Sequence, residues 1–157
     1  MAELSKALTV RVSGSGRDVG KTMLATRLIS WLSDRGHRVA AVKRTHHALP
    51  PDRAGSDTDL MAEAGATRVS FVGPDGVLER SRPAPLEDVV ARLSADADLI
   101  VIEGFRSESL DVQLHLVGEP PARVTIGTSG RSLVRTVSAD DVGTIGEFIE
   151  SELARRA

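Results

Sequence analysis

Cysteine is absent from this 157-residue chain, and its only aromatic residues are one Trp and three Phe. Without cysteine there is no disulfide, no iron–sulfur cluster and no thiolate zinc site. So few aromatics give no stacking platform for single-stranded nucleic acid, and a net charge of −2 leaves no basic footprint for DNA or RNA. No apolar run approaches the roughly 20 residues of a membrane span, and the first residues lack a signal-peptide core. We therefore expect a cytoplasmic protein that binds neither nucleic acid nor a membrane.

The order of helix and strand signals predicts an α/β fold. Apolar runs rich in Val and Ile alternate with segments of helical period, which is typical of a layered fold with a mostly parallel sheet. The length suits one domain over residues 1–157. We expect strands near residues 8–13, 38–43, 68–72, 77–80, 98–103, 110–117, 124–126 and 133–137. We expect helices near residues 21–34, 57–64, 85–93 and 141–155.

Three of these segments carry a further prediction. The sequence Gly73-Pro-Asp-Gly76 between two strand-like runs indicates an antiparallel hairpin. The near-continuous apolar run at 38–43 is typical of a buried parallel strand. Residues 110–117 alternate Leu and Val with polar side chains, which we interpret as a half-exposed edge strand. Such an edge invites pairing with a second copy of the chain, unless the chain's own C-terminal segment covers it.

The most informative motif is a glycine-rich stretch between the first strand and the first helix. It consists of Gly14, Ser15, Gly16, Arg17, Asp18, Val19, Gly20, Lys21 and Thr22, followed by Met23. A strand, a glycine loop, Gly-Lys-Thr and a helix form the arrangement that holds a nucleoside triphosphate. Loop amides and the helix N-terminus bind phosphate oxygens, Lys21 reaches the β- and γ-phosphates, and Thr22 binds Mg²⁺. The loop is one residue longer than the standard pattern and in this resembles dethiobiotin synthetase and related dimeric P-loop proteins.

An acid stands at the end of the clearest apolar strand, in Asp98-Leu-Ile-Val-Ile-Glu103. In open α/β sheets, ligands bind outside the carboxyl ends of the strands. We therefore expect Glu103 to emerge beside the glycine loop. There it would hold the Mg²⁺ shell, directly or through water, or orient an attacking water. The alternative is an ordinary strand-end acid.

Four segments, taken in order, resemble the family of molybdopterin guanine dinucleotide biosynthesis protein B, MobB. They are the glycine loop through Thr22, Lys43-Arg44-Thr45-His46-His47, residues 55–66 and Leu99-Ile-Val-Ile-Glu103-Gly104-Phe105. The resemblance covers about residues 7–117, and Lys-x-Thr-His-His is its most specific element. It implies a P-loop NTPase fold of three α/β/α layers, with a mostly parallel sheet and an antiparallel hairpin or edge extension.

The same resemblance implies a function. Members of the family are GTP-binding adaptors that hydrolyse GTP weakly, form dimers and assist the guanylyltransferase that joins GMP to molybdopterin. Molybdopterin is a further candidate partner. By position, the resemblance assigns Lys21, Glu103 and Asp57 to catalysis, Thr22, Glu103 and Asp57 to Mg²⁺, and Thr45, His46 and His47 to the nucleotide, beside residues 14–23.

Several alternatives stay open. His46 and His47 could contact phosphate or a partner, ligate a metal, or be solvated loop residues. Asp57 could cap its helix, with the cap at this residue or one residue to either side. Lys43 and Arg44 could bind an anionic substrate or be solvated. The chain has no Asn/Thr-Lys-x-Asp guanine reader, so ATP is a candidate beside GTP. An ATP-dependent small-molecule ligase or kinase is therefore the second functional hypothesis. A vestigial nucleotide site is disfavoured by Lys21, Thr22 and Glu103.

Overall fold

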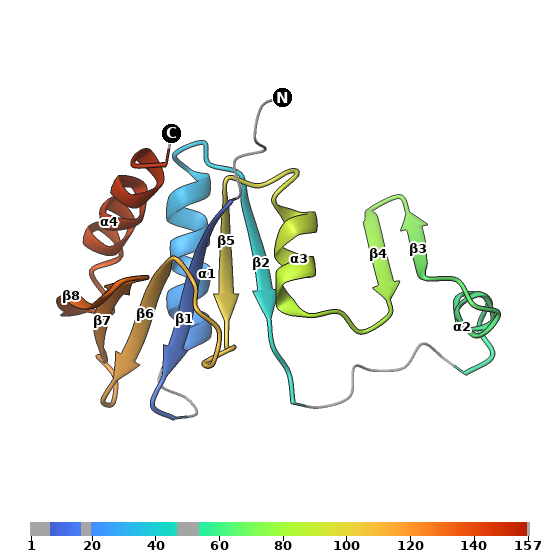
Figure 1. Ribbon diagram of the computed structural model, residues 1–157, viewed down its shortest axis with the longest axis horizontal. Coiled ribbons are helices and arrows are strands. Elements are labelled where there is room, and N and C mark those ends of the chain that lie inside the picture. The colour runs from blue at the N-terminus through green and yellow to red at the C-terminus, as the bar shows by residue number, and fades with distance from the viewer. Residues whose placement is uncertain (1–6, 17–19, 47–53, 157) are drawn as a thin grey trace. The chain divides into compact units, whose positions relative to one another are not determined.

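The computed structural model describes residues 7–16, 20–46 and 54–156, in two compact units. The first unit combines residues 1–44 with residues 90–157, and the second comprises residues 45–89. Figure 1 shows a sheet with its helices in the first unit, and a short helix with a hairpin in the second. The expectation of one domain over residues 1–157 stays a prediction.

The first unit is built on a six-stranded sheet, with the order β2-β5-β1-β6-β7-β8. The strands β2, β5, β1 and β6 run parallel to one another, and β7 and β8 extend the sheet antiparallel. This mostly parallel sheet confirms the predicted α/β class. The strands are β1 (Leu8–Gly14), β2 (Val39–Lys43), β5 (Leu99–Glu103), β6 (Val112–Val117), β7 (Arg123–Thr128) and β8 (Arg131–Ser138).

Two helices form the core of the first unit with the sheet. Helix α1 (Lys21–Ser33) contributes the fully buried Leu28 and Leu32, and α4 (Val142–Ala154) contributes Ile145 and Ile149. These side chains recur at helical spacing, which is why each helix presents one apolar stripe. Helix α3 (Leu86–Leu93) spans the boundary between the two units. No helix in the described ranges is long and apolar enough to cross a membrane.

Strand β6 corrects the prediction of an edge strand at residues 110–117. It pairs with β1 on one side and with β7 on the other, so it lies inside the sheet. Its Leu114 and Leu116 belong to the core, whereas Gln113 and His115 alternate with them and are only half-buried. Alternation of apolar and polar residues shows that the two faces of a strand have different surroundings. A strand inside a sheet can have such different faces just as an edge strand can. Of the two alternatives for this segment, the second is confirmed: β7, from the C-terminal part of the chain, pairs with the side of β6 at which a second copy would have bound.

Strand β2 departs from expectation in the opposite sense. Among the described strands it pairs only with β5, and it forms one edge of the six-stranded sheet. Its residues are half-buried or exposed, including Ala41 and Lys43, so the strand is not buried on both faces as its composition predicts. An edge strand lacks a neighbour on one side, and its side chains are less covered for that reason.

The second unit contains the predicted hairpin and short helix. Strands β3 (Arg68–Gly73) and β4 (Gly76–Ser81) pair antiparallel around the Pro-Asp turn, as the sequence indicates. Helix α2 spans Asp57–Glu63. The Ser56 side chain caps it by accepting a hydrogen bond from the Asp59 amide at 3.3 Å. Asp57 is thus the first helical residue and not the cap.

Candidate functional site

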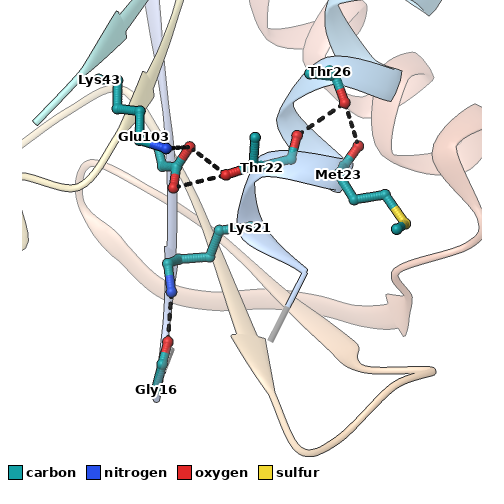
Figure 2. Close-up of polar contacts among 7 residues, drawn as sticks. All are labelled: Gly16, Lys21, Thr22, Met23, Thr26, Lys43 and Glu103. Atoms are coloured by element: carbon teal, nitrogen blue, oxygen red, sulfur yellow. Dashed lines mark hydrogen bonds and ion pairs between the residues drawn. The ribbon is translucent and has the colours of Figure 1, made fainter. Parts of the chain in front are cut away.

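The strand order brings predicted site residues of the first unit together at the carboxyl ends of the parallel strands. Strand β5 lies between β1 and β2, and Glu103 pairs in register with Val12 on one side and with Lys43 on the other. The glycine loop follows the carboxyl end of β1 and leads into α1. The carboxyl ends of parallel strands are where α/β proteins bind ligands. Figure 2 shows Glu103 beside Thr22, the second residue of α1.

The amino end of α1 has features that favour an anion. Gly20 precedes the helix with φ +89°, a left-handed conformation that favours glycine. It has no side chain with which to cap the helix, and the first turn carries no acidic residue. The first amide groups of a helix have no partner within it and carry a partial positive charge. The Lys21 ammonium adds a full charge and donates a hydrogen bond to the Gly16 carbonyl at 2.5 Å.

A carboxylate and a hydroxyl meet next to this helix end. Thr22 Oγ1 lies 3.1 Å from Glu103 Oε1 and 3.0 Å from Oε2, so the hydroxyl is within hydrogen-bonding distance of both oxygens. Lys43 Nζ lies 3.7 Å from Glu103 Oε2. The Glu103 side chain is only 15% exposed, whereas that of Lys43 is 64% exposed. Lys43 is therefore partly exposed to solvent and ion-paired with Glu103, the acid at the end of β5.

The oxygens of Thr22 and Glu103 suit a magnesium ion. Mg²⁺ prefers oxygen ligands, keeps several waters and is usually bound through one or two carboxylates together with substrate phosphates. A hydroxyl and a carboxylate held within hydrogen-bonding distance, beside an anion-attracting helix end, match that pattern. Across the described ranges, no group of three or more His, Asp and Glu side chains gathers to hold a metal ion. Phosphate oxygens and waters would therefore have to complete the shell.

The remaining predicted residues fall elsewhere. Thr45, His46 and Asp57 belong to the second unit, so their contact with the nucleotide or the metal stays a prediction. Within that unit, Asp59 accepts a hydrogen bond from the Gly55 amide at 3.0 Å and pairs with Arg80 at 3.3 Å. The hydrogen bond from Gly55, with that from Arg80, lowers the pKa of Asp59. Four predicted residues lie outside the described residues: Arg17, Asp18, Val19 and His47.

Sequence reasoning missed a polar network on β1 and β6. Ser13 Oγ lies 2.9 Å from His115 Nδ1, and burial, reinforced by the charges of Arg106 and Arg11, lowers the pKa of His115. Arg11 is almost completely buried in the middle of β1. A signal was present in the sequence, because Thr9, Arg11 and Ser13 alternate with apolar residues along the strand predicted near residues 8–13.

The chain is similar to known proteins both in sequence and in structure. The family model described as molybdopterin guanine dinucleotide synthesis protein B matches residues 9–121. The molybdopterin-guanine dinucleotide biosynthesis adapter protein of Haemophilus influenzae is 32% identical over 95 residues, which are 58% of this chain and 53% of that protein. A crystal structure of molybdopterin-guanine biosynthesis protein B superimposes with a TM-score of 0.66 at 27% identity, covering 94% of this chain and 99% of that one.

A second kind of relative is also found. The ATP-dependent dethiobiotin synthetase of Haloferax mediterranei is 30% identical over 137 residues, which are 85% of this chain and 56% of that protein. The matches to both kinds of curated relative therefore span only about half of the relatives' length.

Proposed function

Because this chain belongs to the MobB family, which takes part in molybdopterin guanine dinucleotide biosynthesis, we propose that it is a GTP-binding accessory protein of that pathway. It binds GTP with Mg²⁺, hydrolyses it weakly and assists the guanylyltransferase that joins GMP to molybdopterin. Molybdopterin itself is a candidate ligand of the assembled pair. The family also leads us to propose a homodimer, by a route other than β6, which is paired on both sides.

One observation carries the nucleotide proposal: the Thr22 hydroxyl and the Glu103 carboxylate meet at 3.0–3.1 Å at the amino end of α1. Lys21 and the first amide groups of α1 would bind the β- and γ-phosphates. Thr22 and Glu103 would hold Mg²⁺, which when bound neutralises charge on the phosphates. Glu103 would also orient a water near the terminal phosphate, and Lys43 would keep the carboxylate in place.

Substitution of Lys21 by Ala tests this proposal. Hydrogen bonds to charged groups contribute about 1.5–3 kcal/mol, so we expect the affinity for GTP with Mg²⁺ to fall at least about tenfold. Calorimetry with GTP measures the affinity, and circular dichroism checks that the fold is retained. Arg27→Ala is a matched control, because Arg27 is on α1 too but pairs with the surface residue Asp140. Equal affinity of the Lys21 variant and the unaltered protein would rule out the phosphate-binding role of the loop.

The second candidate is an ATP-dependent small-molecule ligase or kinase. It is supported by the similarity to dethiobiotin synthetase, which extends over 85% of this chain. Both candidates use the same phosphate site and differ in the base and the acceptor. Competition between GTP and ATP at a fixed Mg²⁺ concentration separates them. A strong preference for GTP favours the accessory protein, and a preference for ATP favours the ligase or kinase.

A further inference from the structure

The segment that follows Glu103 has an unusual backbone. Residues 104–108, which we call the strap, begin with Gly104 at φ +102° and Phe105 at φ +54°. Left-handed conformations are rare for a residue with a side chain and persist where the surroundings enforce them. A Cβ on Gly104 would lie 3.0 Å from the Cβ of Arg44, so this position is tight as well. Something must therefore hold the strap against the end of the sheet.

Arg11 holds the strap from inside the sheet. Its Nη1 donates to three strap carbonyls, those of Phe105 at 3.1 Å, Arg106 at 2.8 Å and Glu108 at 2.8 Å. Its Nη2 donates to Gln113 Oε1 at 2.6 Å. All four acceptors are neutral oxygens, the residue is 9% exposed, and burial lowers the pKa of the guanidinium. Burying a charge is costly unless its hydrogen bonds are made. Within the described residues Arg11 Nε has no partner, and most of the bonds that Nη1 and Nη2 make go to the strap backbone.

The strap in turn presents a cation to the glycine loop. The Arg106 guanidinium donates to the carbonyl of Gly14, where β1 ends and the loop begins. Lys21 donates to the carbonyl of Gly16, two residues further along. Two positive groups from different elements thus converge on one short stretch of loop. In the described part of the chain, no acidic side chain forms an ion pair with either of them.

We propose that Arg106 is a second cationic residue for the polyphosphate chain of the bound nucleotide, and that Arg11 is the positioning residue that aims it. This rests on the proposed nucleotide site. The physical reason is that a guanidinium forms charge-assisted, two-pronged hydrogen bonds with phosphate oxygens, which are stronger than its bond to a neutral carbonyl. Arg106 exchanges the Gly14 carbonyl for a phosphate oxygen, while Arg11 keeps the strap backbone unchanged.

Calorimetry with GTP and with inorganic tripolyphosphate, each with Mg²⁺, tests Arg106. We expect Arg106→Ala to weaken the binding of both probes by at least about tenfold, because the contact is with phosphate and not with the base. Arg106→Lys should bind both probes more tightly than Arg106→Ala but less tightly than the unaltered protein. Lysine restores the positive charge but lacks the planar guanidinium that forms two hydrogen bonds at once. Arg38→Ala is the control for loss of a positive charge, because Arg38 pairs with Asp98 at the opposite, amino-terminal end of its strand. It should bind both probes as the unaltered protein does.

Arg11 is tested through its dependence on Arg106. We expect Arg11→Met to weaken binding of both probes, and the double variant Arg11→Met/Arg106→Ala to be no weaker than Arg106→Ala alone. Thermal unfolding reports whether Arg11→Met folds; if it does not, the two Arg106 variants still decide the main claim. Additive losses in the double variant would overturn the positioning role.

The outcomes also separate this inference from the proposed function. Suppose that Arg106→Ala binds both probes as tightly as Arg38→Ala does, while Lys21→Ala has lost binding. The phosphate site is then supported, and Arg106 has only the structural role of a hydrogen-bond donor to the Gly14 carbonyl. A loss for GTP without any loss for tripolyphosphate would equally overturn the phosphate contact. If Lys21→Ala also binds normally, the proposed nucleotide site itself is wrong.

Discussion

Helices α1 and α4 meet at a contact that leaves no room for a methyl group. A Cβ added to Gly146 of α4 would lie 2.4 Å from Cε3 and 2.5 Å from Cζ3 of Trp31. Real Cβ atoms essentially never approach within 3.0 Å of another heavy atom. Trp31 cannot yield without cost, because it packs against the core and Arg35 stacks on its ring at 3.4 Å. The substitution Gly146→Ala must therefore separate the helices or displace the ring.

The expected effect is a net loss of stability. Ala is favoured over Gly inside a helix by about 1 kcal/mol, whereas overpacking costs about 1–3 kcal/mol. A contact as short as 2.4 Å lies at the severe end of that range. We expect Gly146→Ala to lower the free energy of unfolding by about 1–2 kcal/mol. For a chain of this length, that corresponds to a fall in Tm of about 2–8 °C.

Urea denaturation and thermal unfolding, followed by circular dichroism, measure this change. Gly143→Ala is the matched control in the same helix, because the nearest atom to its added Cβ is Asp141 Oδ1 at 4.0 Å. It should leave stability unchanged or raise it by about 0.4–1 kcal/mol. Combining Gly146→Ala with Trp31→Leu should cost less than the sum of the two single changes, since the clash is removed. Equal stability of the Gly146 and Gly143 variants would refute the helix contact described above.

Two further predictions concern carboxylates at opposite ends of the sheet. Glu103→Gln keeps a hydrogen-bond partner for the Thr22 hydroxyl but removes the negative charge. We therefore expect the rate of Mg²⁺-dependent GTP hydrolysis to fall by about tenfold or more, while the Kd for GTP changes less. Equal hydrolysis rates for the variant and the unaltered protein would assign Glu103 a structural role alone. The hydrogen bond from the Arg38 side chain lowers the pKa of Asp98 in the folded protein. The ionised Asp98 therefore stabilises the fold fully at a pH above its pKa in the unfolded chain, about 3.9, and this stabilisation is lost as the pH falls through the lower pKa of the folded state. The difference in unfolding free energy between the unaltered protein and Asp98→Asn should therefore be present at pH 7 and shrink below about pH 4, and a difference that stays constant with pH would contradict this.

The site in the first unit depends on the order of strands more than on any single motif. Glu103 and Lys43 are 60 residues apart in the chain. They meet because β5 and β2 pair in parallel register, so that their last residues are level. Thr22 reaches the same carboxylate because α1 follows β1, the other neighbour of β5. A change of register in either pair would separate these groups by several ångströms, since each residue advances a strand by about 3.3 Å.

The sequence by itself was enough for the features that depend on local backbone chemistry. The helix that begins at Lys21, the Pro-Asp hairpin and the strand ending at Glu103 are set by residues adjacent in the chain. Glycine at left-handed positions and apolar periodicity carry this information directly. The α/β class follows from the alternation of such elements, and the structure confirms it.

Only the tertiary structure decided which strands are neighbours. The alternating pattern of β6 is the same for an edge strand and for an interior strand with one polar face, so it could not reveal that β7 covers its outer side. The apolar run of β2 likewise did not reveal a strand at the edge. The ion pair of Lys43 with Glu103 and the capture of the strap by Arg11 join residues 60 to 97 positions apart. Such contacts are set by packing and strand register, which no local pattern encodes.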